Sequence, residues 1–384
     1  MPLLILGSII INLFSWIFIA SEIYLWRQWF LYKDVIINNR IDNDVHNYAQ
    51  RCLIGAIALL VYILLGKRLI GPLLGKRRIN EEAPKAVRCP EQEQITRVDG
   101  TVIHIEHCGV KGKQTIFFIH GCNSNSMQWY YQEKYFSKNY HLILMDLPGF
   151  GLSSKPVNNN YSIDNLAADL NLVIEKTKPV DPVIWGHSMG GFVILKYCKL
   201  FKDKLVNVKG IILEHTTYTN PTKTSVLSSI LTAIQEPLLK PLCYIMIALA
   251  PVLWLSKWLG FLNGNSLIQA RVLTFAGSQT YQQLNFAVYL STVVSPAVTG
   301  RAVLAMFNYD VTAALREITV PALIISAVYD KLTMPVASEY MRVHIPKSKL
   351  TVLNLAGHMG FIERHQQVNE AADRFVNSLI DKSL

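Results

Sequence analysis

Charged residues are scarce in this chain of 384 residues. Asp, Glu, Lys and Arg together make up 17% of it, whereas hydrophobic residues make up 51%. An apolar share this large is more than an ordinary soluble enzyme of this length carries. We therefore expect part of the chain to contact lipid.

The first 26 residues contain no lysine or arginine, and Glu22 is their one acid. The missing basic start, the long apolar run and the lack of a small-residue cleavage site argue against a cleaved signal peptide. The run is long enough to cross a bilayer. A second apolar run, residues 52–66, is short for a span. Two alternatives follow: two spans, or one span and an interfacial helix.

Basic residues gather directly after the second run. They are Lys67, Arg68, Lys76, Arg77 and Arg78. By the positive-inside bias they predict that both termini and everything after residue 78 face the cytoplasm, with residues 27–51 on the other side. The formal net charge is +10. Attraction of these residues to anionic lipid explains this charge, so we expect a membrane partner and no nucleic-acid partner.

The six cysteines, at positions 52, 89, 108, 122, 198 and 243, show no Cys-x-x-Cys spacing. This excludes the common zinc and redox motifs and predicts free thiols in a reducing compartment. His104 and His107 lie three apart on an expected strand, so they face opposite sides and make a poor metal pair. The run "GFGLSS" from Gly149 lacks the third glycine of a dinucleotide-binding loop. We expect neither a metal nor a cofactor.

Apolar runs of strand length alternate with helical segments from about Glu93 onward. The expected strands read TVIHIEHCG, TIFFIHG, HLILMDLPG, PVIWGHS, KGIILEHT, PALIISAVYD and KLTVLNLAGH, and the expected helices cover residues 126–138, 162–176, 188–201, 335–343 and 366–379. The alternation predicts a mostly parallel α/β sheet with helices on both faces, in which chemistry gathers at the carboxyl ends of the strands.

One long insertion interrupts this alternation, and long insertions of this kind form caps. We therefore divide the chain into a membrane anchor (1–90), a catalytic domain (91–215 and 301–384) and a helical cap (216–300). Residues 216–300 contain a single acid, Glu236, and four cations, Lys223, Lys240, Lys257 and Arg271.

The segment PVIWGHSMGGFVILKY, residues 182–197, passes from a strand to a helix at Ser188. Gly186 and Gly190 remove the side chains that would collide in so sharp a turn, which predicts a nucleophile elbow. The alternative is a glycine-rich turn with a passive serine. Asp330 and His358 each follow a later strand, which completes a triad in the order Ser, Asp, His. Glu214 also ends a strand and is an alternative acid.

Five motifs in register resemble the α/β-hydrolase superfamily over residues 93–384: HGCNSNSMQW, DLPGFGLSS, GHSMGG, YDKLTMP and AGHMGFIE. The resemblance implies that Ser188 is the nucleophile, that His358 is the general base and acid, and that Asp330 orients His358. It also implies that the backbone N–H groups of Cys122 and Met189 form the oxyanion hole.

The nucleophile type narrows the expected reaction. Related dehalogenases and epoxide hydrolases carry aspartate at the position of Ser188, and the HGxP turn of epoxide hydrolases reads HGCN here. Serine with a histidine base favours acyl transfer through an acyl-enzyme that water resolves.

Three aromatic residues of the cap, Trp254, Trp258 and Phe261, recur at helical spacing. They either pack on the catalytic domain or lie in the membrane interface, with Lys240 and Lys257 at the headgroups. We favour a membrane-anchored serine hydrolase that cleaves a lipid or another hydrophobic ester, similar to membrane-bound monoacylglycerol lipases and lysophospholipases. The alternatives are a thioesterase, a C–C bond hydrolase, a haloperoxidase-like enzyme and a non-enzymatic membrane scaffold.

Overall fold

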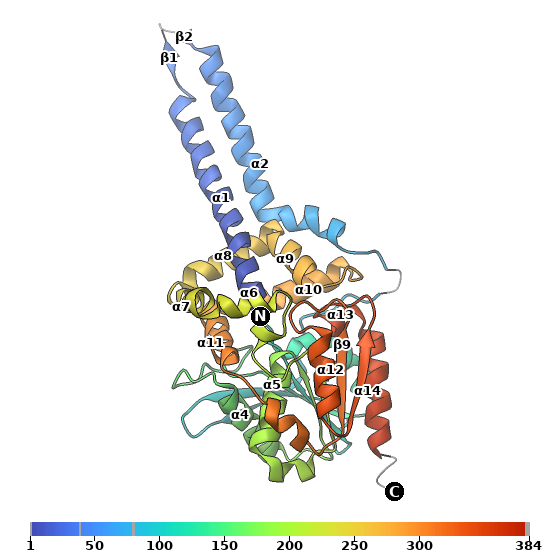
Figure 1. Cartoon of the computed structure of the whole chain (residues 1–384). Coiled ribbons are helices and arrows are strands. Elements are labelled where there is room, and N and C mark those ends of the chain that lie inside the picture. Colours follow the sequence, from blue (N-terminus) through green and yellow to red (C-terminus); the bar gives the residue numbers. More distant parts are fainter. Residues whose placement is uncertain (1, 38–39, 79–80, 381–384) are drawn as a thin grey trace.

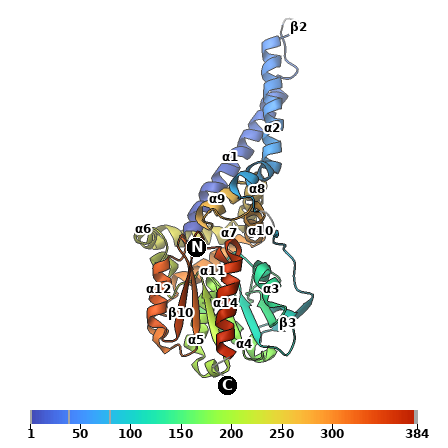
Figure 2. The same ribbon diagram turned by 90° about the vertical axis from the view of Figure 1, so that its right-hand side faces the viewer.

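Two long helices form a hairpin that stands away from the rest of the chain (Figures 1 and 2). The computed structural model describes residues 2–37, 40–78 and 81–380. Helices α1 (Pro2–Tyr32) and α2 (Asn43–Leu74) are joined through the short strands β1 (Ile36–Ile37) and β2 (Arg40–Ile41). Asp42 caps α2 by accepting hydrogen bonds from the backbone N–H groups of Asp44 and Val45.

Both hairpin helices are long and apolar enough to cross a membrane. At about 1.5 Å per residue, each is roughly 45 Å long, which exceeds the thickness of a bilayer core. The second apolar run therefore lies in a helix of 32 residues, which favours the alternative of two spans. Two further pairs of cap helices, each bent by about 90°, would raise the number of candidate spans to four if each pair were one span.

The base of the hairpin packs on the cap. The side chain of Asn263 donates a hydrogen bond to Ser15 Oγ of α1 (3.2 Å). Lys67 of α2 places its ammonium 3.6 Å from the ring centre of Phe261. Gln279 Nε2 donates to the carbonyl of Leu74 at the end of α2 (2.9 Å). The hairpin is thus joined to the cap by specific contacts as well as by the chain itself.

The central sheet has eight strands. They are β3 (Glu91–Thr96), β4 (Val102–Gly109), β5 (Thr115–Ile119), β6 (His141–Met145), β7 (Val183–His187), β8 (Gly210–Glu214), β9 (Ala322–Ala327) and β10 (Ser348–Leu353). Their order is β10-β9-β8-β7-β5-β6-β4-β3. Pairing is parallel from β10 to β6, and β4 and β3 pair antiparallel at one edge.

Alternate residues of the buried strands enter two separate cores. In β5, Phe117 and Ile119 belong to one core, and Ile116 and Phe118 belong to the other. The first core receives α4 (Ile163–Thr177), α5 (Met189–Leu200) and α12 (Pro335–His344), and the second receives α3 (Tyr130–Phe136), α13 (Gly360–Glu363) and α14 (His365–Ile380). These two covered faces confirm the predicted α/β-hydrolase fold. Strand β3 is not among the expected strands, because its sequence EQEQIT has little apolar character.

The insertion between β8 and β9 is helical. Its elements are η3 (Pro221–Lys223), α6 (Ser228–Ala233), η4 (Gln235–Leu239), α7 (Lys240–Ala248), α8 (Ala250–Asn263), α9 (Asn265–Leu273), α10 (Tyr281–Thr292), α11 (Pro296–Phe307) and η5 (Thr312–Glu317). The predicted boundary of the cap at residue 300 falls inside α11. Helices α8, α9 and α10 lie between the hairpin and the sheet (Figure 1), whereas η5 packs against α5 and α12.

The cap corrects two of the predicted membrane contacts. Phe261 is 5% exposed and packs in the second core, so it does not reach the surface. Lys257 donates to the carbonyls of Ser291 and Val294 at the end of α10 (2.6 and 2.8 Å). A cation is favourable where helix carbonyls lack partners, so Lys257 caps α10 and is not a headgroup contact. Trp254 and Trp258 are partly exposed, at 38% and 36%.

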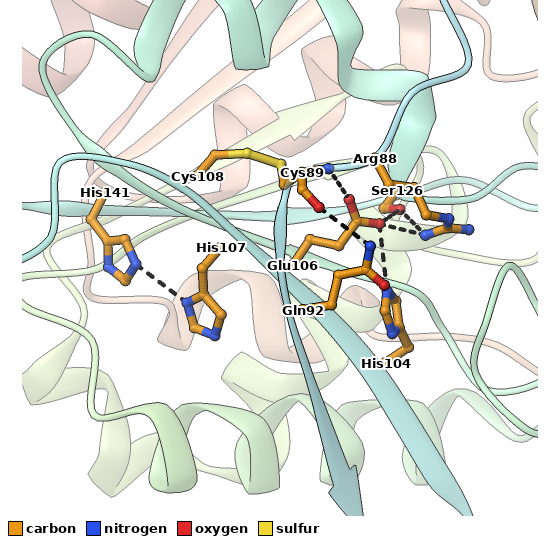
Figure 3. The surroundings of a disulfide bond; sticks show 9 residues. All are labelled: Arg88, Cys89, Gln92, His104, Glu106, His107, Cys108, Ser126 and His141. Carbon is orange, nitrogen blue, oxygen red and sulfur yellow. Dashed lines mark hydrogen bonds and ion pairs between the residues drawn. A yellow bond between two sulfur atoms is a disulfide. The ribbon is translucent and has the colours of Figure 1, made fainter.

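Cys89 and Cys108 form a disulfide, with their Cα atoms 5.8 Å apart (Figure 3). The expectation that all six cysteines are free thiols is therefore wrong for this pair, whose separation of 19 residues matches no common motif. Cys89 precedes β3 and Cys108 lies in β4, so the antiparallel pairing of these strands brings the two thiols together. The other four cysteines are free and buried.

The disulfide removes one basis for the predicted cytoplasmic orientation. Disulfides persist in oxidising compartments and are rare in the cytosol. The positive-inside argument is also weaker than the basic run after residue 66 suggests, because cations also lie at the other end of the hairpin. They are Arg27, Lys33, Arg40 and Arg51.

We expect four reactive thiols in the denatured full-length protein without reductant and six with reductant. The measurement is the gel shift that a maleimide-linked polymer gives when it is added, without any earlier thiol block, to membranes dissolved in denaturant. The double variant Cys89→Ser/Cys108→Ser serves as the control and should give four thiols under both conditions. Six reactive thiols without reductant would show that the pair is reduced in the membrane.

Candidate active site

Ser188 occupies the turn between β7 and α5, with φ 52° and ψ −115°. A residue with a side chain rarely adopts a positive φ, and such strain persists only where the surroundings enforce it. The neighbouring glycines make the turn possible. A Cβ on Gly186 would lie 2.5 Å from the carbonyl carbon of Gly190, and a Cβ on Gly190 would lie 2.2 Å from the carbonyl oxygen of Ile119. Both predicted elbow glycines are thus required by close packing.

Strand β8 and the residues after it hold the backbone of Ser188. The N–H of Ser188 donates to the carbonyl of Glu214 (2.9 Å). The hydroxyl of Thr216 donates to the carbonyl of Ser188 (2.7 Å). Both backbone polar groups of Ser188 thus have partners that hold the turn in place.

Ser188, His358 and Asp330 form a continuous hydrogen-bonded chain. His358 Nε2 lies 3.0 Å from Ser188 Oγ, and His358 Nδ1 lies 2.9 Å from Asp330 Oδ2. All three side chains are buried. The geometry suits transfer of the serine proton to Nε2 while the carboxylate fixes the ring through Nδ1–H.

The carboxylate of Asp330 is stabilised by donors that surround it. It accepts from the backbone N–H groups of Leu332 and Thr333 (2.8 and 3.0 Å) and from Thr333 Oγ1 (2.8 Å). Burial opposes its charge, but His358, His215 and these donors hold the pKa of Asp330 well below its usual range. Thr333 is not among the predicted site residues, although an acid with a threonine three residues later is typical of such a turn.

Glu214, the alternative acid, lies in a different environment. Its Oε2 accepts from Trp185 Nε1 (2.8 Å), and its side chain is fully buried. Burial raises the pKa of Glu214 to about 8, against the effect of this hydrogen bond. A carboxyl group that is neutral near pH 7 is not the anion that a protonated histidine needs. Asp330 therefore fits the acid position, and Glu214 fits a structural role.

Two predicted oxyanion donors lie next to the nucleophile. The loop before Cys122 approaches Ser188 closely, because a Cβ on Gly121 would lie 3.2 Å from Ser188 Cβ. Met189 begins α5, where backbone N–H groups lack helical partners and favour a negative charge. Burial raises the pKa of the Cys122 thiol to about 11, so the thiol is neutral. The neutral thiol carries no charge to this site, and the backbone N–H of Cys122 stays the predicted donor.

Glu363 fixes the loop that carries His358. Its carboxylate accepts from the N–H of Gly357, directly before His358, and from the N–H groups of Ala276 and Ser278 in the cap (3.0, 3.0 and 2.9 Å). The catalytic loop and the cap are thereby joined through one buried carboxylate. The motif AGHMGFIE contains Glu363, but only the fold shows which backbone groups it binds.

A cavity of about 130 Å³ opens beside the triad. His358, His187, Cys122 and Lys257 contribute to its walls, together with residues from α1, α9 and α10. Neither α1 nor Lys257 carries a catalytic motif, so sequence reasoning does not place them at this cavity.

One cluster resembles a metal site. Ligand atoms of His104, Glu106 and Asp146 lie within 4.8 Å of one another. Arg88 occupies the place of a cation there, because its guanidinium pairs with both Glu106 and Asp146 (Figure 3 shows the contact with Glu106). Ser126 also donates to Glu106 (2.5 Å) and, through its N–H, to Asp146 (2.7 Å). The cluster is best explained as a structural ion-pair network under the oxyanion loop.

Comparisons with known proteins support the α/β-hydrolase fold. A family model for the alpha/beta hydrolase fold matches residues 114–365. Epoxide hydrolase 1 of Caenorhabditis elegans is 32% identical over 108 residues, a match that spans about a quarter (27%) of each chain. An esterase from Exiguobacterium antarcticum superposes with a TM-score of 0.59 at 24% identity, covering 74% of this chain and 98% of its own. A bacterial membrane phospholipase A has a TM-score of 0.57 at 19% identity, covering 86% and 99%.

We expect Ser188→Ala to abolish labelling by a fluorophosphonate, because the probe bonds to an activated serine oxygen. Asp330→Asn should lower the labelling rate by orders of magnitude, on the order of 10⁴-fold, since His358 loses the acceptor that fixes its tautomer. Glu214→Gln is the matched control and should label within a few-fold of the wild type. Normal labelling of Ser188→Ala, or loss in Glu214→Gln with retention in Asp330→Asn, would contradict these roles.

Glu214 also makes stability depend on pH. Its raised folded-state pKa means that the folded protein keeps a proton that the unfolded chain loses between about pH 4.5 and 8. The free energy of unfolding contributed by this group therefore falls as pH rises through that window. We expect Glu214→Gln to gain thermal stability relative to the wild type over the same window, measured as Tm in detergent. A Tm difference that stays constant with pH would contradict the assignment.

Proposed function

Because the chain belongs to the α/β-hydrolase fold family, we propose that it is a membrane-anchored serine hydrolase that cleaves carboxylic esters of lipids. The observation that carries the proposal is the hydrogen-bonded chain from Ser188 through His358 to Asp330. A passive serine in a glycine-rich turn would not require a buried histidine and carboxylate in this order.

In the proposed reaction, Ser188 Oγ attacks the ester carbonyl while its proton passes to His358 Nε2. The N–H groups of Cys122 and Met189 stabilise the oxyanion, and a donor of this kind contributes about 3 kcal/mol to the transition state. His358 then protonates the leaving alcohol, and the acyl group stays on Ser188. Water, deprotonated by His358, releases the acid and restores the serine.

The nucleophile favours this chemistry over epoxide opening. The epoxide hydrolase relative matches only part of this chain, and the position after His187 holds serine here. A serine ester intermediate is resolved by the same histidine that activated the serine, which suits carboxylic esters. Thioester and C–C bond cleavage use similar steps on this fold, so a thioester belongs among the substrates to be tested.

Apolar surface near the site favours a lipid substrate. Large apolar side chains are exposed along α7 and α8, the helices next to the hairpin. They are Tyr244, Ile245, Leu249, Val252, Trp254, Leu255 and Trp258. Exposed apolar patches of this kind mark membrane or ligand contact. We propose that this face, with Trp254 and Trp258, lies in the membrane interface.

The hairpin suggests where the catalytic domain lies. If α1 and α2 both span, the first residues of α1 and the whole chain after α2 share one side of the membrane. We propose that this side is an oxidising compartment, because the Cys89–Cys108 pair favours such a compartment over the cytosol.

Purified full-length protein in nanodiscs should hydrolyse a long-chain monoacyl ester, and Ser188→Ala should lower that rate at least 1,000-fold, since the triad acts as one unit. The substrate panel also contains a short-chain ester, a long-chain thioester and a fatty epoxide. Faster turnover of the thioester would move the assignment to a thioesterase. Epoxide opening that survives Ser188→Ala, or no Ser188-dependent turnover of any ester, would contradict the proposal.

A further inference from the structure

The first turns of the anchor helix α1 lie at the cavity beside His358. Leu4, Ser8 and Ile11 line the cavity that also borders His358. Gln269 of α9 holds this end of α1 by donating to the carbonyl of Leu4 and to Ser8 Oγ (3.1 and 3.2 Å). Because a helix that only tethers an enzyme needs no place beside its catalytic histidine, these contacts call for another explanation.

A second cavity, of about 360 Å³, adjoins the first. The residues that line both cavities are Leu4, Ser8, Asn123, Lys257 and Ser291. Four of these five carry polar side chains, so the junction is a polar neck. The rest of the second cavity is almost entirely apolar, with walls from α1, α7, α8 and α11. A polar neck that joins the cavity beside His358 to an apolar chamber matches an ester group followed by its acyl chain.

The second cavity follows α1 away from the triad. Its lining residues on this helix run from Leu4 to Trp16, a rise of about 18 Å at 1.5 Å per residue. Ile9 and Leu13 lie on this wall and are 43% and 61% exposed. Since α1 is long and apolar enough to span a bilayer, these partly exposed side chains bring the cavity to the lipid-facing surface of the helix.

We propose that α1 forms one wall of an acyl-chain channel through which a monoacyl lipid passes sideways from the bilayer to Ser188. The chain lies between α1, α7 and α11, and the ester stays at the neck beside Lys257. Under this arrangement the acyl chain reaches the triad without crossing water, and the anchor helix sets the chain length that fits. The inference rests on the proposed function for the reaction, whereas the binding site itself does not depend on turnover.

In the kinetic test, tryptophan substitutions on two different helices narrow the proposed channel. Ile9→Trp narrows it from α1 and Ile245→Trp narrows it from α7, since both residues line the second cavity only. Phe14→Trp of α1 and Leu238→Trp of η4, the turn directly before α7, are the matched controls, because these exposed residues do not line either cavity. We expect the filling variants to lose at least 10-fold in kcat/KM for an 18-carbon monoacyl ester, and the controls less than 2-fold. All four should hydrolyse a 4-carbon ester within 2-fold of the wild type.

A binding measurement separates this inference from the proposed reaction. The Ser188→Ala variant in nanodiscs is incubated with a monoacyl lipid that carries a photoreactive diazirine in the middle of its acyl chain, and is then illuminated. We expect the label on the α11 peptide that contains Val303, a cavity residue that is 0% exposed, and loss of that label in Ser188→Ala/Ile9→Trp. If α11 is labelled but the wild type hydrolyses no ester, the proposed reaction is contradicted and the proposed acyl-chain channel is supported. Turnover with equal long-chain rates in all variants, or label confined to exposed surfaces, would overturn the channel.

Discussion

The backbone of Ser188 is held in a conformation that side chains rarely adopt, and the catalytic site depends on that constraint. At a positive φ, the serine oxygen projects above the ends of β7 and β8, where His358 is able to reach it. The two hydrogen bonds from Ser188 N–H and to Ser188 C=O, together with the glycines that pack behind the turn, keep the strained conformation populated. If the turn relaxed, the serine would lose its histidine and its oxyanion donors at once.

Most of the catalytic domain was predictable from the sequence because its strands are buried on both faces. Runs such as TIFFI and GIILE are long, apolar and rich in β-branched residues, so they stand out from the helices between them. The triad was predictable for a related reason, since parallel strands place their carboxyl ends at one edge and the residues that follow them meet there. Strand position alone leaves both Asp330 and Glu214 open as the acid, because both end strands. The motif YDKLTMP favours Asp330, and in the fold the carboxylate of Asp330 contacts His358, whereas that of Glu214 binds Trp185.

Other features lie in contacts between segments that the sequence does not connect. Cys89 and Cys108 meet because β3 pairs with β4, and β3 carries no apolar pattern that would reveal the pairing. Phe261 and Lys257 sit on an amphipathic-looking helix, but the hairpin and α10 cover them. Hydropathy predicts that the first 26 residues contact lipid, but it predicts the same for a helix that only anchors the protein and for one that also lines a substrate cavity. The contacts of Gln269 with Leu4 and Ser8 show that the start of α1 is docked on α9, which hydropathy does not reveal.

In the proposed arrangement, the hairpin and the cap act together on the path from the bilayer to the triad. Figure 1 shows α8, α9 and α10 between the hairpin and the sheet, so a lipid that enters along the proposed channel would meet the cap before the triad. Glu363 joins the cap to the loop of His358, which ties the geometry of the entrance to the geometry of the catalytic base. In this account, the hydrogen bonds of Glu363 stabilise both the cap that would bind the acyl chain and the loop that carries His358.

The most direct test is an experimental structure of the full-length protein in a lipid nanodisc after inactivation with a long-chain alkyl phosphonate. We expect phosphorus bonded to Ser188 Oγ, a phosphonyl oxygen facing the N–H groups of Cys122 and Met189, and an alkyl chain that lies between α1 and α7. Phosphorus on another residue would contradict the catalytic assignment. An alkyl chain that leaves the site on the side away from α1 would contradict the role of the anchor helix.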